Sequence, residues 1–337
     1  MSTLLSRRLA TAVIASLAAL AATTGVMAAE VTLKASHQFP GGKGDARDEM
    51  VQLIAREVEK AGVGLTIQVY PGSSLFKAKE QWGAMTKGQL DISAFPLDYA
   101  SGRVPQFSAT LMPGLVRNHD RAKRLNASPF MDDIKKIIAD NDVIVLSDAW
   151  LAGAFASKKN CITGPDSIKG QVTRAAGPAF EQMLVGAGAS ISSMASSEVY
   201  TGMQTGVLDA ANTSSGSFVS YRLYEQVKCL TAPGANALWF MYEPILMSKK
   251  SFDKLSKAQQ DALLAAGKMA EEYFDGEARK LDDNMIAKFK EAGIEVAEMS
   301  TADYDAWLAI AKETAYKEFS EKVDGGADLI AKALAVE

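Results

Sequence analysis

Arg174 is the residue of this sequence best suited to bind an anion. It lies at the end of a short β-prone run, and small residues, Ala175, Ala176 and Gly177, follow it. A guanidinium is a planar set of donors that matches the two oxygens of a carboxylate. A surface ion pair is the commoner role of an arginine, but the surrounding sequence offers no obvious partner. We therefore expect Arg174 to hold the carboxylate of a ligand.

Asn212 is a second candidate, because of its expected place in the fold. In open α/β sheets, ligands bind beyond the carboxyl ends of strands. Arg174 follows one predicted strand, and Asn212 follows another that starts at Val207–Ala211. We expect the ligand site to form around the stretch from Ile168 to Thr213.

Other residues could complete such a site, and each has a structural alternative. His37 follows the first predicted strand in a glycine-rich turn, where it is either a donor to the ligand or a turn residue. Phe95 ends the third predicted strand and would face the same cleft. Aromatic residues that could wall an apolar pocket, or pack in the core or hinge instead, are Trp150, Phe155, Trp239 and Tyr242.

Residue sets typical of catalysis or of metal binding are missing. The chain has 2 histidines, and the motifs HExxH, CxxC, GxSxG and the phosphate-binding P-loop do not occur. We therefore expect a binding protein that uses no metal and no cofactor. An exported enzyme on an α/β scaffold is the rival interpretation, and assays of turnover against simple binding would separate the two.

The 2 cysteines, Cys161 and Cys229, each lie beside a strand-like run. In an exported protein they could form a disulfide. Two buried thiols are the alternative, and the sequence leaves both open.

The N-terminus predicts export to the periplasm. Arg7 and Arg8 precede an apolar run over residues 9–22, and small residues lead to a cleavage site after Ala28 or Ala29. The run is short for a membrane span. The formal net charge is -4 and Lys/Arg residues are not clustered, so we expect no nucleic-acid partner.

The order of predicted elements indicates an α/β fold of two lobes with mostly parallel sheets, crossing strands and a long C-terminal helix. The predicted strands are 31–36, 65–70, 90–95, 143–150, 189–193, 207–211, 238–248 and 294–297. The predicted helices are 45–61, 77–86, 120–140, one that ends near 186, 196–205, 257–292 and 301–332.

Two of these strands, 143–150 and 238–248, are expected to cross between the lobes. After a signal peptide at 1–28, the first lobe would hold residues 29–150 and about 240–278. The second lobe would hold residues 151–239 and about 279–337. With no flexible linker in the chain, the lobes should be joined by ordered crossings.

One segment recurs. Met85–Asp91 reads MTKGQLD and Met203–Asp209 reads MQTGVLD, with an aromatic residue before each, Trp82 and Tyr200. Two copies are too few for a solenoid. They suit two similarly wound lobes whose strand ends face one cleft.

These motifs resemble the solute-binding proteins of tripartite ATP-independent periplasmic (TRAP) transporters, of the DctP type. The resemblance covers nearly the whole chain after the signal. Its most specific parts are Lys169–Arg174, Glu198–Tyr200 and Met203–Asp209, and Tyr70–Leu75 and Gly88–Asp91 are also similar.

The resemblance implies a two-lobed periplasmic-binding-protein fold that closes on a small organic acid. It implies delivery of that acid to the TRAP membrane permease subunits by a receptor that we expect to be monomeric. It places the family's carboxylate-binding arginine on Arg174 and a second polar contact in the region of Asn212.

Two departures from the family bear on the ligand. Members that bind sialic acid or C4-dicarboxylates often carry another arginine after the first crossing strand, where Phe155 stands here. Members that bind a metal-chelated keto acid have an acid–Trp pair, where Asn212 and Thr213 stand here. We expect a monocarboxylate with an apolar or aromatic body. The alternatives are a C4-dicarboxylate receptor and the ligand-binding subunit of an ABC importer or a sensor.

Overall fold

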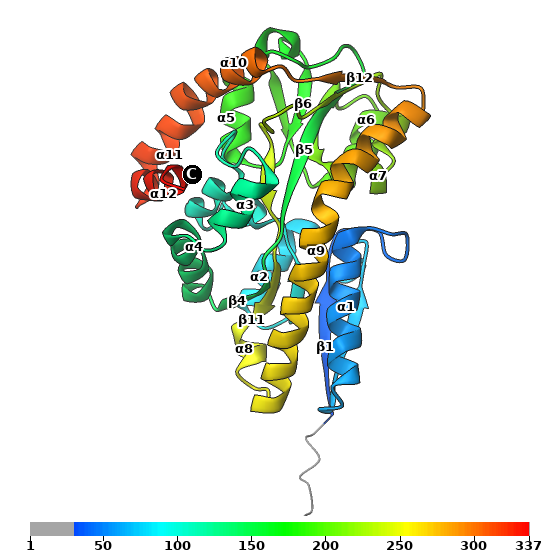
Figure 1. Cartoon of the computed structure of the whole chain (residues 1–337), viewed down its shortest axis with the longest axis vertical. Coiled ribbons are helices and arrows are strands. Elements are labelled where there is room, and N and C mark those ends of the chain that lie inside the picture. Colours follow the sequence, from blue (N-terminus) through cyan, green and yellow to red (C-terminus); the bar gives the residue numbers. More distant parts are fainter. Residues whose placement is uncertain (1–29, 337) are drawn as a thin grey trace, which may run out of the picture.

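The chain folds into two α/β lobes that are joined by strands and by one long helix (Figure 1). This computed structural model describes residues 30–336. The predicted signal peptide therefore lies outside the described residues. The expected class, an α/β fold in two lobes, is confirmed, but the sheets are mixed because the crossing strands run antiparallel to their neighbours.

The first lobe is built on a sheet with the strand order β2-β1-β3-β11-β4. Its strands are β1 (Val31–Ser36), β2 (Leu65–Tyr70), β3 (Ile92–Ala94), β4 (Val143–Ser147) and β11 (Ile245–Ser248). Strands β1, β2 and β3 are parallel, so their carboxyl ends lie at one edge of the sheet.

The helices of this lobe follow the predicted periodicity, with two divisions. Helix α1 (Ala46–Lys60) begins where the Asp45 side chain accepts the Arg47 N–H, and it buries a face that contains Met50, Ile54 and Val58. The predicted helix 77–86 is a 3-10 turn, η1 (Ala78–Glu80), followed by α2 (Gln81–Thr86).

The predicted helix 120–140 is two helices, α3 (His119–Leu125) and α4 (Pro129–Asp140). Pro129 has no N–H to continue α3, and the Ser128 side chain accepts the Met131 N–H and caps α4. The segment before them contains two further 3-10 helices, η2 (Leu97–Ala100) and η3 (Pro105–Leu111).

The second lobe has the strand order β12-β9-β5-β8-β6-β7, with β10 paired to β5. Its strands are β5 (Trp150–Ser157), β6 (Val172–Ala175), β7 (Ser190–Ser193), β8 (Ala210–Ser214), β9 (Cys229–Ala232), β10 (Phe240–Tyr242) and β12 (Glu295–Glu298). Its helices are η4 (Pro165–Ile168), α5 (Pro178–Gly186), η5 (Ser196–Glu198), α6 (Val199–Gln204), α7 (Ser215–Ser220) and η6 (Leu223–Glu225).

The recurring segment forms the same turn in both lobes. Gly88 follows α2 with φ 72°, and Gly206 follows α6 with φ 80°, a conformation that favours glycine. The N–H of Leu208 then bonds back to the carbonyl of Gly202 at 3.0 Å. This turn delays the strand that was predicted from residue 207, so that β8 begins at Ala210.

The aspartate of each copy accepts a hydrogen bond from the backbone of a neighbouring strand. Asp91 Oδ2 accepts the N–H of Lys34 at 2.7 Å, and Asp209 Oδ2 accepts the N–H of Val172 at 2.9 Å. The repeat thus holds β1 in one lobe and β6 in the other. Arg174 lies two residues beyond the point where β6 is held.

Each predicted crossing strand is a pair of shorter strands. The segment 143–150 divides between β4 and β5 at Asp148 and Ala149, and the segment 238–248 divides between β10 and β11 at Glu243 and Pro244. Pro244 has no N–H to donate to a sheet. The chain therefore changes sheets at these two breaks, side by side, where the N–H of Glu243 bonds to the carbonyl of Ala149 at 2.8 Å.

Helix α9 (Lys257–Glu291) runs along both lobes (Figure 1) and packs against α1 below and α7 above. A short helix, α8 (Lys249–Phe252), precedes it. Ser256 and Gln259 form a capping box that fixes its start. The predicted helix 257–292 is confirmed.

The C-terminal region, predicted as one helix over 301–332, is divided into α10 (Thr301–Ala311), a π-helical turn (Lys312–Tyr316), α11 (Lys317–Lys322) and α12 (Gly326–Leu334). Gly325, with φ 70°, allows the turn before α12. Helix α12 then packs against α4 (Figure 1). The end of the chain therefore returns to the first lobe, although the sequence suggested the second lobe for residues 279–337.

Cys161 and Cys229 form a disulfide, which joins the segment before η4 to the start of β9. Of the two alternatives that the sequence left open, the bridge is the one observed.

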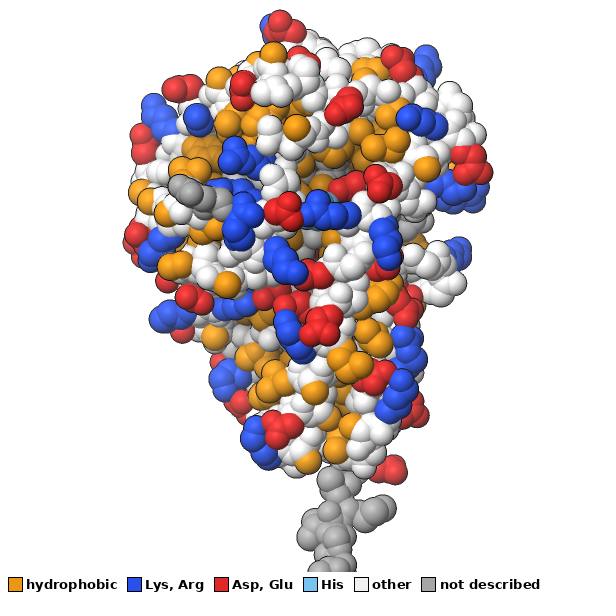
Figure 2. All heavy atoms as spheres, in the orientation of Figure 1, with side chains coloured by type: hydrophobic (Ala, Val, Ile, Leu, Met, Phe, Trp, Pro, Cys, Tyr) orange, Lys and Arg blue, Asp and Glu red, His pale blue; other side chains and the backbone are white. Residues whose placement is uncertain are grey.

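The surface carries mixed charge. Acidic and basic side chains are interspersed over both lobes on the face drawn in Figure 2, and many form short-range pairs such as Lys257–Asp261. Within residues 30–336, no helix has the length and apolar character that a membrane span requires.

Candidate ligand-binding site

Arg174 lies near the carboxyl end of β6 with only 1% of its surface exposed. Its Nε donates to the carbonyl of Met194 at 3.0 Å, Nη1 to the carbonyl of Asn212 at 2.9 Å, and Nη2 to the hydroxyl of Tyr99 at 3.0 Å. A guanidinium has five N–H donors. Beyond these bonds, one donor therefore remains on each terminal nitrogen, and such a pair matches the two oxygens of a carboxylate.

Arg174 differs from the other buried arginines of residues 30–336 in what surrounds it. Arg47 pairs with Asp45 at 2.7 Å and with Glu243 at 3.3 Å. Arg121 donates to the carbonyl of Ala333 at the end of α12, at 2.9 Å. Within the described chain, Arg174 makes no ion pair and caps no helix end. Burying a charge without an ion-pair partner is costly, which favours an anion supplied from outside.

The Tyr99 hydroxyl joins the two lobes at this point. It comes from η2 of the first lobe and accepts hydrogen bonds from Arg174 Nη2 at 3.0 Å, from the N–H of Ser196 at 2.8 Å and, at the longer distance of 3.5 Å, from Gln38 Nε2. A phenol oxygen has two lone pairs and one hydrogen. Since these donors use its lone pairs, the hydroxyl hydrogen is left to donate to an acceptor beside Arg174.

Asn212 lies within β8 rather than beyond a strand end, and it is fully buried. Its Nδ2 donates to the carbonyl of Arg174 at 3.1 Å. Among the described residues, Asn212 Oδ1 has no hydrogen-bond partner, and neither has Thr173 Oγ1. Thr173 pairs with Ala210, two residues before Asn212, so both side chains lie on one face of the sheet. Unpartnered buried polar atoms call for a ligand or water.

Trp239 covers the start of β5 on the same side. A Cβ at Gly153 would lie 2.4 Å from Trp239 Cε3 and 2.1 Å from the carbonyl oxygen of Thr213, so the close approach requires glycine. Trp239 Nε1 is also buried without a partner in residues 30–336. Trp239 therefore stays among the candidate ligand contacts.

The first-lobe candidates lie at the carboxyl ends of β1 and β3, as expected. His37 Nε2 is 3.1 Å from Asp48 Oδ1, and its Nδ1 has no partner within the described chain. Phe95 is packed in the core against Trp82, and its ring lies edge-on to Tyr99 with centroids 6.2 Å apart. Phe95 thus supports the tyrosine that contacts Arg174.

Three aromatic candidates are occupied elsewhere. Phe155 stacks on Trp307 with ring centroids 5.5 Å apart, in the core beneath α10. Trp150 donates from Nε1 to Asn126 at 2.8 Å, and its ring lies 5.0 Å from that of Tyr242. Core and hinge packing, the alternative that the sequence left open, accounts for these contacts.

Comparison with known families identifies this architecture. The model of a family described as bacterial extracellular solute-binding protein, family 7 (DctP), matches residues 43–322. The chain belongs to this family. A solute-binding protein of Albidiferax ferrireducens is 41% identical over 305 residues, which cover 89% of this chain and 90% of that protein.

Solved structures of TRAP solute-binding proteins have the same fold. One from Rhodoferax ferrireducens, with bound malonate, matches with a TM-score of 0.86 at 41% identity and covers 89% of this chain and 96% of that one. DctP7 of Bordetella pertussis, a receptor binding pyroglutamic acid, matches with a TM-score of 0.82 at 20% identity, over 90% of this chain and 99% of that one. The resemblance that the sequence motifs indicated is confirmed.

Sequence reasoning missed one interlobe cluster of this solute-binding protein. Arg47, at the start of α1, reaches across to the second lobe and donates to Ser214 and Ser217, each at 3.0 Å. Glu243 lies beside it at the chain crossing, where burial raises the pKa of Glu243 to about 7 against the opposing charge of Arg47. In the sequence Arg47 resembles any exposed residue of a helix start, so no local signal marked it.

Asp98 and Tyr99 were also missed, although a signal was present. They follow the third predicted strand by a few residues, and β3 ends at the edge that faces the second lobe. The rule that placed Phe95 at the cleft extends to the turn after it. Further contacts close the same edge: Lys79 Nζ lies 3.3 Å from Ser193 Oγ.

Proposed function

We propose that this protein is the periplasmic receptor of a TRAP transporter and that it binds a small organic anion by seating one carboxylate on Arg174. The observation that carries the proposal is a buried guanidinium with no ion pair in residues 30–336 and one unused donor on each terminal nitrogen. The malonate bound by the 41% identical TRAP protein supports a carboxylate ligand.

The charges near Arg174 favour a ligand with a single carboxylate. Arg47 is already paired with Asp45 and with Glu243. A second ligand carboxylate would therefore be buried without an arginine of its own, at a cost of several kcal/mol by order of magnitude. We propose a monocarboxylate with an apolar or aromatic body.

A short dicarboxylate is the second candidate, and the malonate of the same relative favours it. In that case the second carboxylate would be bound by Lys79, whose Nζ lies 3.3 Å from Ser193 Oγ at the same edge.

When the receptor binds its ligand, the two lobes rotate about the two strand breaks and along α9, and the ligand lies between the two lobes. Tyr99 donates its hydroxyl hydrogen to the carboxylate and holds the fork of Arg174 across the cleft. The signal peptide is removed after Ala28 or Ala29, and the monomeric receptor delivers its anion to the membrane permease subunits.

A binding screen tests this proposal. The mature protein is titrated calorimetrically with pyroglutamate, lactate, benzoate, phenylacetate, malonate and succinate, after a thermal-shift screen of the same acids. We expect one or more monocarboxylates to bind tightly and succinate to bind weakly. Tight binding of succinate with no binding of any monocarboxylate would reject the single-carboxylate assignment. If the acids are recovered chemically unchanged after long incubation with the protein, this result would argue against the alternative hypothesis that the protein is an enzyme.

Substitution of Arg174 tests the anion contact itself. Removing one partner of a buried, hydrogen-bonded charge pair costs about 2–5 kcal/mol, so Arg174→Ala should weaken binding by about 30-fold or more. Arg174→Lys should restore only part of the lost affinity, because lysine lacks the two parallel N–H donors of a guanidinium. Arg56→Ala, which removes an exposed arginine from α1, is the matched control and should change binding by less than twofold.

A further inference from the structure

Asp98 is a buried acid of the first lobe that the proposed binding contact does not use. It lies in η2 with 2% of its surface exposed. Its Oδ1 accepts a hydrogen bond from Ser101 Oγ at 2.9 Å, and its Oδ2 has no partner among the described residues. A buried carboxylate with an unpartnered oxygen is costly in its charged form.

The second lobe is what buries this carboxylate. A Cβ built on Gly177, directly before α5, would lie 1.7 Å from Asp98 Oδ2 and 2.6 Å from its Cγ. The carboxylate therefore touches the backbone of the opposite lobe. When the lobes separate, this side of Asp98 is returned to water.

The groups that face Asp98 do not offset its burial. Glu181 of α5 repels its charge, while Arg174 of β6 and Lys79 of η1 attract it. The first turn of α5 also favours the ionised form, by an amount of about 0.3–1 kcal/mol. Burial is the largest influence and raises the pKa of Asp98 to about 7, from an ordinary value of 3.8.

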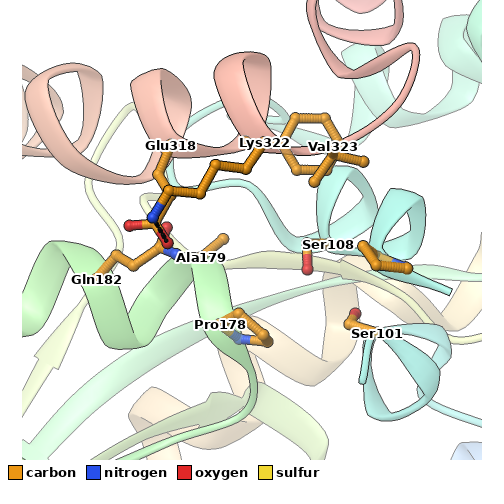
Figure 3. A pocket seen from close by; sticks show the side chains of 10 residues that line it. Ser101, Ser108, Pro178, Ala179, Gln182, Glu318, Lys322 and Val323 are labelled. Carbon is orange, nitrogen blue, oxygen red and sulfur yellow. Dashed lines mark hydrogen bonds and ion pairs between the residues drawn. The ribbon is translucent and has the colours of Figure 1, made fainter. Parts of the chain in front are cut away.

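A pocket lies at the seam between the lobes, next to the residue that donates to this acid (Figure 3). The cavity is about 100 Å³ in volume and is bounded by η2 and η3, by the start of α5 and by α11. Ser101 lines it, and the hydroxyl of Ser101 is the donor to Asp98. Glu318 and Lys322 form an ion pair on the α11 side. The Ser101 side chain therefore lies between this pocket and the carboxylate.

We propose that Asp98 takes up one proton from solvent when the lobes close, so that the receptor binds its organic anion together with a proton. The proposal rests on the proposed function, because it requires closure on a carboxylate ligand. In the step, a hydronium ion or buffer acid gives its proton to an Asp98 oxygen, and no other bond changes.

The sign of the resulting pH dependence follows from the two states. The closed state has the raised pKa and binds more protons than the open state, so lowering the pH favours closure. Affinity should fall as the pH rises towards about 7, the pKa of Asp98 in the closed state, and should then level off at higher pH. Binding should be about tenfold tighter at pH 6 than at pH 8.

Calorimetry in buffers of different ionisation enthalpy counts the protons taken up on binding. The ligand is the tightest-binding acid of the panel above. At pH 7 the wild-type protein should take up about half a proton more than Asp98→Asn, which is neutral in both states. Both proteins bind the same ligand, so any protons that the ligand itself takes up or releases cancel in this difference. Asp166→Asn, which removes an exposed acid of the second lobe, is the control and should keep the wild-type uptake.

A second variant keeps the proposal testable if Asp98→Asn does not fold. Ser101→Ala removes the hydrogen bond that lowers the pKa of Asp98, so uptake at pH 7 should increase towards one proton. Equal uptake in wild type, Asp98→Asn and Ser101→Ala would overturn the proposal, as would loss of uptake in Asp166→Asn. Failure of every acid to bind would instead reject the proposed function.

Discussion

Gly177→Ala should block closure without disturbing either lobe. Gly177 has φ -170°, which is extended backbone that alanine adopts freely. The new methyl group would lie 1.7 Å from Asp98 Oδ2, 2.6 Å from Cγ and 2.9 Å from Oδ1. The whole Asp98 carboxylate must therefore move, and the lobes must part. Overpacking of this kind costs about 1–3 kcal/mol, all of it in the closed state.

The assay compares ligand affinity with the stability of the ligand-free protein. Affinity should fall by a factor of about 5 to 150, while the free energy of unfolding without ligand changes by about 1 kcal/mol or less. Gly102→Ala, in the turn after η2 with no atom near its added Cβ, is the matched control and should bind normally. Adding Asp98→Ala to Gly177→Ala should restore room for closure. Affinity of Gly177→Ala within twofold of wild type would refute the closed-state contact.

Three other changes separate binding from stability. Tyr99→Phe keeps the ring and removes the hydroxyl that accepts from Arg174, so affinity should fall by about 10-fold to 150-fold, the effect of a lost charge-assisted hydrogen bond, and unchanged affinity would exclude Tyr99 from the site. Cys161→Ser with Cys229→Ser opens a disulfide across 68 residues and should cost about 2–5 kcal/mol in the free energy of unfolding; denaturant titration measures this, and a loss of affinity without a loss of stability would contradict a structural role. Phe155→Ala should lower stability by about 3–5 kcal/mol without changing ligand preference, and a switch towards dicarboxylates would return Phe155 to the site.

The sequence was sufficient for the α/β class and for most strands because these features are local. Alternating apolar residues fix β1 and β2, and the repeated glycine and aspartate of Met85–Asp91 and Met203–Asp209 form the same turn in each lobe. Arg174 was a candidate from the sequence because small residues follow it, and its role in binding stays a prediction.

The contacts between the lobes could not be read from local patterns. Asp98 and Gly177 are far apart in the sequence and meet only through the packing of η2 against α5. Phe155 faces the core because alternate side chains of β5 point to opposite faces of the sheet and because its ring stacks on Trp307 of α10. Trp307 is far away in the sequence, so no local pattern identifies it as the partner. The return of α12 to α4 likewise depends on long-range packing after the turn at Gly325.

The most direct test of the central claim is a crystal structure of the protein with its tightest-binding acid. We predict one ligand carboxylate between the lobes, with its two oxygens at about 2.7–2.9 Å from the terminal nitrogens of Arg174. The bonds of Arg174 to Met194 and Asn212 should remain. A ligand bound away from Arg174, or an Arg174 that turns to a protein carboxylate in the complex, would contradict the account.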